Sequence, residues 1–181
     1  MKKFALTCCM LLYTMLATAQ KTPPNPYENW GICPFECCTY REWTAEADVP
    51  VHKTRSDQSP LLFQLRRGEL LDALTGVVIT ENPAIIKVAR AVRDGYINGS
   101  HEPQLSLKPG DIVYMLTPLG EGAYLFWYKG KVYQAGSMEM QGNPGIEGKG
   151  MKLTWWKQVR NKAGKTGWTK SEDFSNVDAC G

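Results

Sequence analysis

The feature that most constrains this chain is a series of short segments in its C-terminal third that alternate apolar and polar residues. Segments 108–114, 155–160 and 164–168 show this pattern, and glycine-containing turns lie beside them. A period of two predicts half-buried β-strands. The chain holds 17 glycines in 181 residues and shows no long stretch of helical periodicity. We therefore predict an all-β fold with many turns.

The first residues have the features of a secretory signal peptide. Lys2 and Lys3 precede an apolar stretch, residues 4–16, and Ala17-Thr18-Ala19 forms an A-x-A cleavage site. A membrane anchor needs about 20 apolar residues, which this stretch does not reach. We predict that residues 1–19 are removed, and that the mature protein is periplasmic or secreted in a bacterium and has no membrane span.

The charge balance argues against two classes of partner. The whole chain carries a formal charge of +3, and loss of Lys2 and Lys3 leaves 3 − 2 = +1. No basic run interleaves with aromatic residues, which disfavours binding to nucleic acid. No polybasic amphipathic segment is present to bind a membrane surface.

Four cysteines follow the signal peptide, and an even number in an exported chain predicts disulfides. A bridge between the adjacent Cys37 and Cys38 would be strained. Two pairings remain open, in which Cys33 takes one of this pair and Cys180 takes the other. A bridge to Cys180 would stabilise the fold by about 4 kcal/mol because it closes a long loop. Neither histidine has ligand spacing to these cysteines, so we predict no metal and no cofactor.

The chain contains a weak internal repeat. Residues 65–74 and 107–116 each place a turn of glycine and an acidic residue, Gly68-Glu69 and Gly110-Asp111, before an apolar strand. A polar, turn-rich point at residues 98–100 predicts a boundary between two units. We expect a leader over residues 20–35, a first unit over 36–100 and a second over 101–181. A glycine-rich insertion, residues 135–150, falls in the second unit.

The order of motifs resembles the bacterial SH3-like (SH3b) domain. The segment Trp155-Trp156-Lys157-Gln158-Val159-Arg160 is followed by Gly164-Lys165-Thr166-Gly167-Trp168, and the likeness covers roughly residues 36–174. The resemblance implies tandem small SH3-like β-barrels, and it implies that the polar loop 54–60 forms one wall of a ligand groove. It also implies cell-wall peptides or protein segments as ligands.

No constellation of residues predicts catalysis. His52 and His101 lack a partnered nucleophile. The acidic residues that could serve as a glycosidase pair are most simply turn or surface residues, namely Asp111, Glu121, Glu139 and Glu147. Three methionines, Met138, Met140 and Met151, have no histidine or cysteine beside them to complete a copper site.

Aromatic residues favour binding instead. Tyr124, Trp127 and Trp156 are the predicted aromatic wall of a ligand site, because Tyr and Trp offer large contact areas with a polar handle. Glu121 and Arg160 are its predicted flanking charges. Trp155 and Trp168 are assigned to the core or to contacts between the two domains.

We predict a non-catalytic exported module that recognises a peptide or a peptidoglycan segment in the cell envelope. The alternative is a structural or assembly factor that binds an envelope protein, and a cell-wall hydrolase is a third candidate.

Overall fold

The computed structural model describes residues 22–93, 95–100, 105–137, 143 and 150–180. The predicted signal peptide therefore lies outside the described residues, as does most of the glycine-rich segment 135–150. The described residues contain no helix, and none of their segments could cross a membrane as a long apolar helix. The all-β prediction is confirmed. The described strands are β1 (Tyr27–Trp30), β2 (Glu42–Ala45), β3 (Val49–His52), β4 (Leu61–Leu65), β5 (Leu70–Asn82), β6 (Ala84–Lys87), β7 (Tyr96–Ile97), β8 (Ile112–Gly120), β9 (Ala123–Tyr128), β10 (Lys131–Gly136), β11 (Lys152–Asn161), β12 (Thr166–Thr169) and β13 (Phe174–Ser175).

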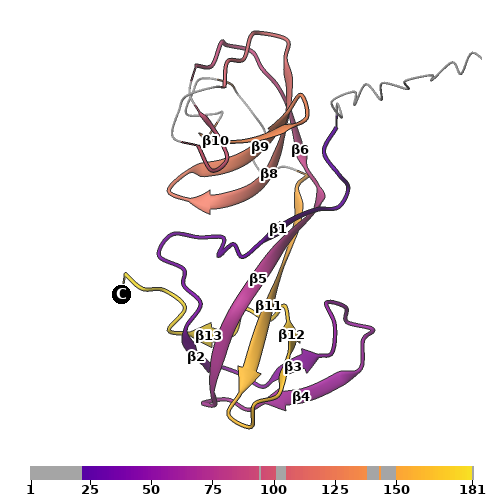
Figure 1. Cartoon of the computed structure of the whole chain (residues 1–181), viewed down its shortest axis with the longest axis vertical. Coiled ribbons are helices and arrows are strands. Elements are labelled where there is room, and N and C mark those ends of the chain that lie inside the picture. The colour runs from indigo at the N-terminus through magenta and orange to yellow at the C-terminus, as the bar shows by residue number, and fades with distance from the viewer. Residues whose placement is uncertain (1–21, 94, 101–104, 138–142, 144–149, 181) are drawn as a thin grey trace, which may run out of the picture.

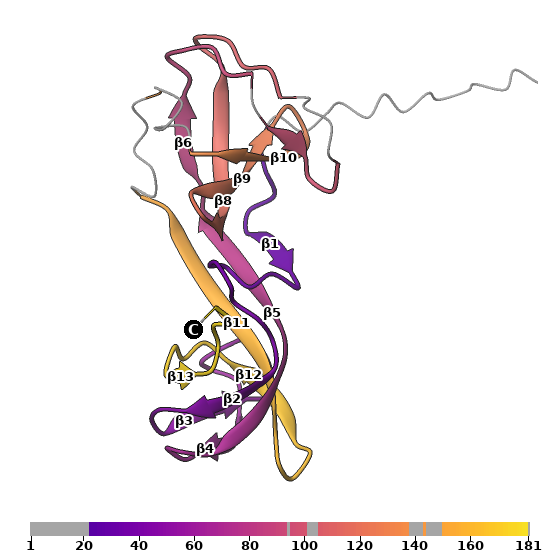
Figure 2. The same ribbon diagram turned by 90° about the vertical axis from the view of Figure 1, so that its left-hand side faces the viewer.

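These strands form two curled sheets at opposite ends of an elongated molecule (Figure 1). An eight-stranded sheet has the order β13-β2-β5-β11-β12-β3-β4, and β1 pairs with β5 as well. A five-stranded sheet has the order β6-β8-β9-β10-β7. The long antiparallel pair β5 and β11 runs from one end of the molecule towards the other, and β1 lies along β5 between the sheets (Figure 2).

The two sheets are nested in the sequence. Strands β6 to β10, residues 84–136, form the five-stranded sheet, which we call the inserted unit. The strands before and after it form the eight-stranded sheet, which we call the outer unit. The expected boundary at residues 98–100 does not follow this division, because strands on both sides of it belong to the inserted unit. The reason is that β11 finds its partner in β5, about 80 positions earlier, and such a distant pairing leaves no local sequence signal.

The internal repeat corresponds to two turns with the same hydrogen bonds. The Glu69 amide donates to the Arg66 carbonyl at 3.0 Å, and the Asp111 amide donates to the Lys108 carbonyl at 3.0 Å. Gly68 and Gly110 have φ of 84° and 93°, a region where glycine is favoured. In both units the strand that follows the turn pairs with an earlier strand of the same unit. β5 pairs with β2, and β8 pairs with β6.

Each unit has its own core. The core of the outer unit is rich in aromatic side chains, including Trp43 and Phe174. The core of the inserted unit is mainly aliphatic, with Phe126 and Tyr133 as its buried aromatic residues. The hydroxyl of Thr80, which is fully buried in β5, donates to the Leu116 carbonyl of β8 at 2.7 Å and links the units.

Two disulfides lie in the outer unit. Cys33 pairs with Cys38 and Cys37 pairs with Cys180, with Cα–Cα distances of 5.4 and 5.6 Å. This is one of the two pairings that the sequence left open. The second bridge fastens the last described residues to the segment between β1 and β2.

The C-terminal half of the chain contains two β-hairpins. β9 and β10 turn at Lys129-Gly130, and β11 and β12 turn before Gly164. Residues 171–173 form an open loop, because Ser171 bonds Asp173 through its side chain and Phe174 begins β13.

Candidate functional site

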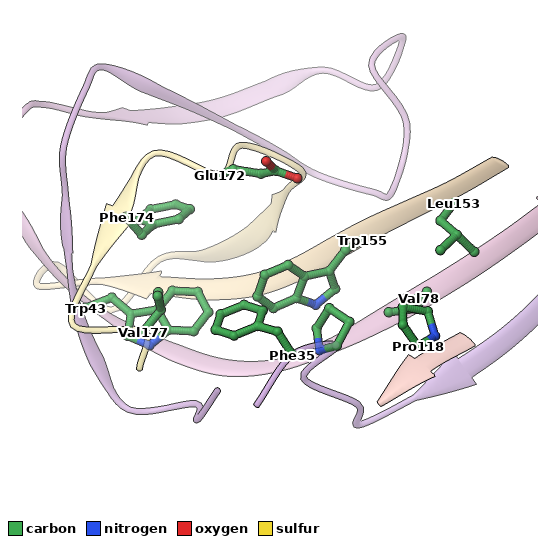
Figure 3. Close-up of a pocket in the computed structure, with 10 residues that line it drawn as sticks. Phe35, Trp43, Val78, Pro118, Leu153, Trp155, Glu172, Phe174 and Val177 are labelled. Atoms are coloured by element: carbon green, nitrogen blue, oxygen red, sulfur yellow. The ribbon is translucent and has the colours of Figure 1, made fainter. Parts of the chain in front are cut away.

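A groove of about 360 Å³ lies mainly on the outer unit, and we call it the aromatic groove. Its lining is almost entirely apolar, with one carboxylate, and comprises Pro34, Phe35, Trp43, Val78, Pro118, Leu153, Trp155, Glu172, Phe174 and Val177. Phe35 and Trp155 lie at its centre, between Val78, Leu153 and Pro118 at one end and Trp43, Phe174 and Val177 at the other (Figure 3).

The floor of the groove is fixed by hydrogen bonds of its aromatic rings. The Trp155 indole N–H donates to the Tyr40 hydroxyl at 3.0 Å, and that hydroxyl donates to the Ile32 carbonyl at 2.5 Å. The Trp43 indole N–H donates to the Thr39 carbonyl at 2.9 Å. Burial raises the pKa of Tyr40 to about 12, so its hydroxyl stays protonated. A floor whose polar atoms are all paired is rigid before any ligand arrives.

Gly76 allows these rings to approach the sheet. A Cβ at this position of β5 would lie 2.1 Å from the Tyr40 Oη and 2.6 Å from the Trp155 Nε1. Any side chain there would displace both rings. Gly76 therefore shapes the groove without lining it.

One wall of the groove is the loop closed by the Cys33–Cys38 disulfide. Pro34 and Phe35 lie inside this loop, and the Phe35 ring meets the Trp155 ring edge-on with centroids 6.0 Å apart. Phe35 remains 38 % exposed. A short covalently closed loop cannot bring its aromatic residue into the core, and so presents it to solvent beside Trp155.

The inserted unit contributes the end of the groove through β8. Pro118 lines it, and the glycine that ends β8 packs against the disulfide loop. A Cβ on Gly120 would lie 2.6 Å from the backbone nitrogen of Glu36. This contact brings the β8–β9 turn, with Glu121 at φ 49°, beside the loop that carries Phe35.

The charges around the groove are mainly negative. Glu172 lines it, Glu36 follows Phe35, and Asp178 follows Val177. The nearby Glu121 carboxylate is the main cause that raises the pKa of Glu36, with smaller contributions from desolvation and Asp178. Among the described residues, neither Glu36 nor Glu121 forms an ion pair with a cation.

Lys157 lies beneath the groove and is only 1 % exposed. Its ammonium sits 4.1 Å from the centroid of the Trp155 ring and donates to the Lys170 carbonyl at 3.3 Å. Desolvation lowers its pKa to about 8, against the opposing attraction of Glu172 and Asp173. Lys157 thus supports Trp155 from below and anchors the loop that carries Glu172.

Two of the predicted site residues lie on β11 of the outer unit. Trp156 is 5 % exposed and faces away from Trp155, as alternation requires. It borders two other clefts, and Asp57 of the polar loop 54–60 lines both of them. Arg160 is exposed and pairs with Asp72 at 3.1 Å.

The other three lie in the inserted unit. Trp127, 9 % exposed, belongs to a cluster with Leu116 and Leu125 against which Tyr27 of β1 packs, and its indole N–H has no partner among the described residues. Tyr124 is half-buried against Phe126, with ring centroids 6.2 Å apart. Only Glu121 lies near the aromatic groove. The structure does not bring the five residues together, and their role in binding stays a prediction.

The described residues offer one group of potential metal ligands, Cys37, Asp178 and Cys180, with ligand atoms within 4.8 Å of one another. Both sulfurs are bonded to each other, which leaves Asp178 alone as a ligand. The half-buried His52 donates from Nδ1 to the Ser59 carbonyl at 2.8 Å, as a structural contact. Met151 packs against the core of the inserted unit. Five other candidates lie outside the described residues, namely His101, Met138, Glu139, Met140 and Glu147.

Sequence reasoning missed most of the groove. It assigned Trp155 to the core or to contacts between the two domains, and it gave no role to Phe35, Trp43, Phe174 or Glu172. Two features of the sequence could have indicated the groove. Phe35 lies inside a six-residue Cys-to-Cys segment, and Trp155 shares its face of β11 with the ionisable Lys157.

The fold and the groove define a disulfide-bonded, all-β protein of two nested sheets with an aromatic cleft at their junction. Comparisons of the chain with protein-family models, curated proteins and solved structures found no match.

Proposed function

We propose that the protein is a non-catalytic exported module that binds an extended peptide in the aromatic groove. The observation that carries this proposal is the groove itself, with four aromatic side chains, two prolines and one carboxylate around about 360 Å³. Aromatic-lined slots are a recurring means of holding extended, proline-containing peptides. Large apolar sites with few polar groups are the usual form of a binding site.

The disulfides support an extracellular or periplasmic setting, because such bonds persist in oxidising compartments. They also stiffen the wall that carries Phe35 and the tail that carries Val177. A preformed wall lowers the entropic cost of binding a flexible ligand.

We propose further that each unit is an SH3-like barrel and that the second is inserted into the first. The support is that both units share one strand order. In the outer unit β2, β5, β11, β12 and β3 lie side by side in that order, and in the inserted unit β6, β8, β9, β10 and β7 do so. When each set of five is numbered along the chain, the order is the same in both units. The shared Gly-acid turns before β5 and β8 support the same interpretation.

A retention assay on peptidoglycan sacculi tests the proposed function. The purified protein, with both disulfides formed, is incubated with intact sacculi, and the soluble fraction is then checked for released muropeptides. We expect retention without release. Release of fragments would overturn the non-catalytic assignment.

The matched variants are Phe35→Ser and Leu74→Ser, because both native side chains are 38 % exposed and only Phe35 lines the groove. We expect Phe35→Ser to lose retention by at least about tenfold, since a groove aromatic is worth more than 1 kcal/mol. Leu74→Ser should bind like the unaltered protein. Equal retention of both variants would exclude the groove, and absence of retention would direct the search to protein ligands.

A further inference from the structure

We infer that the occupant of the aromatic groove is a basic segment of another protein, in which an apolar anchor is flanked by lysine or arginine. This inference rests on the proposed function and specifies the ligand of the same groove. It starts from the charges at the rim. The groove presents apolar contact along its length and carboxylates at its sides.

The negative charges come from three separate parts of the chain. Glu36 belongs to the disulfide loop, Glu121 to the β8–β9 turn, and Glu172 to the loop before β13. All three are exposed. No lysine, arginine or histidine is among the residues that line the groove.

Glu36 and Glu121 are held close together although their charges repel. The close approach of Gly120 to the backbone of Glu36 places the β8–β9 turn, which carries Glu121, beside the disulfide loop, which carries Glu36. The Glu121 carboxylate therefore opposes ionisation of Glu36 and raises its pKa. A cation placed between them relieves this repulsion, and that gain is available only in the complex.

The neighbouring cations are already engaged elsewhere. Lys157 lies beneath Trp155 and is directed towards the Lys170 carbonyl, on the side of Glu172 and Asp173. The Arg41 guanidinium donates to the carbonyls of Asn176 and Asp178. Lys157 thus partly balances Glu172, whereas the pair Glu36 and Glu121 is left to a cation from the ligand.

The apolar lining excludes a ligand that is only charged. Phe35, Trp155 and Phe174 offer ring surface that a polyamine or metal ion would leave in contact with water. A peptide supplies both an apolar side chain for the rings and an ammonium or guanidinium for the rim. Charge complementarity of this kind mainly sets specificity and the rate of association.

The test selects ligands without assuming their sequence. A phage-displayed library of random dodecapeptides is panned against the full chain with intact disulfides, and the enriched consensus is synthesised. Its affinity is measured by fluorescence polarisation for the unaltered protein, for Glu36→Gln/Glu121→Gln and for Glu81→Gln. Glu81 is the control, because it pairs with Lys152 and borders a cleft that does not share the lining of the aromatic groove.

We expect the consensus to carry lysine or arginine beside an apolar anchor. Glu36→Gln/Glu121→Gln should weaken its binding about fivefold, as expected for solvent-exposed charge pairs. The Glu81→Gln variant should bind like the unaltered protein. Raising NaCl from about 50 to about 500 mM should weaken binding to the unaltered protein more than to the double variant, because salt screens exposed charges.

Two further results separate this inference from the proposed function. A neutral or acidic consensus that still fails to bind Phe35→Ser would overturn the charge inference and support the groove. A basic consensus with equal affinity for Glu36→Gln/Glu121→Gln would overturn it as well. Absence of any enrichment, or a consensus that binds Phe35→Ser normally, would overturn the proposed function itself.

Discussion

The outer and inserted units share the order of five strands and a similar turn, yet among the described residues the aromatic groove is lined mainly by the outer unit. The difference lies in the side chains that the common pattern carries. The outer unit brings Trp43, Trp155 and Phe174 together at the groove, whereas Phe126 and Tyr133 of the inserted unit lie within its core. The shared turns and strand alternation set the topology, and the placement of large aromatic residues sets the site.

Covalent closure is the second difference, and it gives the largest predicted effect. Both disulfides belong to the outer unit among the described residues. The double variant Cys37→Ser/Cys180→Ser should lower the free energy of unfolding by about 4 to 5 kcal/mol, because its bridge spans 143 positions. Denaturant unfolding followed by tryptophan fluorescence measures this loss.

The matched control is Cys33→Ser/Cys38→Ser, whose bridge spans 5 positions. The same loop relation gives this variant a loss of about 2 kcal/mol. Its effect should fall on ligand binding more than on stability, because its loop carries Phe35. Equal losses of stability in the two double variants would contradict the loop-length argument.

Close packing against the sheet of the outer unit gives the next prediction. Gly76→Ala should destabilise the protein by about 3 kcal/mol, because the added methyl group overlaps the Tyr40 hydroxyl and the Trp155 indole. The variant should also lose ligand binding, since both rings must move. Thermal unfolding and near-ultraviolet circular dichroism report the two effects.

Gly164→Ala is the control, because this turn position has open space around it and a φ of 77°. It should cost about 1 kcal/mol, from backbone strain alone, and leave binding unchanged. A similar loss for both variants would mean that the floor of the groove adapts to the methyl group.

The sequence predicts the strands of this protein better than it predicts the aromatic groove. Strands β5, β8, β11 and β12 could be predicted from local alternation and from glycine positions, because these signals act over a few residues. The groove did not follow, because it depends on Phe35, Trp155 and Phe174 meeting from three distant segments. Trp155 and Trp156 show how far strand alternation can predict the site. Alternation correctly placed them on opposite faces, but only the pairing of β11 with β5 decides which face holds the deep groove.

The buried charge of the outer unit offers the third prediction. Lys157 of β11 pairs with Gly76 of β5 in the outer unit, and it is the one buried charged residue among the described residues. Lys157→Met should raise the free energy of unfolding near pH 7 by about 2 kcal/mol, because it removes a poorly paired buried ammonium. Denaturant unfolding at several pH values measures the gain.

The pH dependence supplies its control. The pKa of Lys157 is about 8 when folded and near its ordinary 10.5 when unfolded, so the unfolded chain binds more protons between these values. Stability of the unaltered protein should therefore rise as pH increases from about 8 to about 10.5, and Lys157→Met should lack this rise. The same rise in the variant would assign it to another group.

The shared turn gives the smallest predicted effect and compares the units directly. The Asp111 carboxylate accepts from the Lys108 amide at 2.8 Å and from the Tyr128 hydroxyl at 2.9 Å, whereas the Glu69 carboxylate accepts from the Arg66 amide within its own turn. Asp111→Asn should lower the free energy of unfolding near pH 7 by about 1 kcal/mol, because it weakens two bonds, one of them to β9. Glu69→Gln should cost less.

Acid titration shows whether the turn depends on the charge of the Asp111 carboxyl group or on its shape. The hydrogen bond from the Lys108 amide is the main cause that lowers the pKa of Asp111, with a further contribution from Tyr128. Its stabilisation is present above the unfolded pKa of about 3.9 and is lost as pH falls through the lower folded value. The difference between the unaltered protein and Asp111→Asn should thus shrink towards pH 2, measured by amide exchange of β8 to β10. If the stability difference between the unaltered protein and Asp111→Asn stayed the same at about pH 2, the turn would need the shape of the carboxyl group and not its charge. The two turns would then differ only in the hydrogen bond from Tyr128 to Asp111.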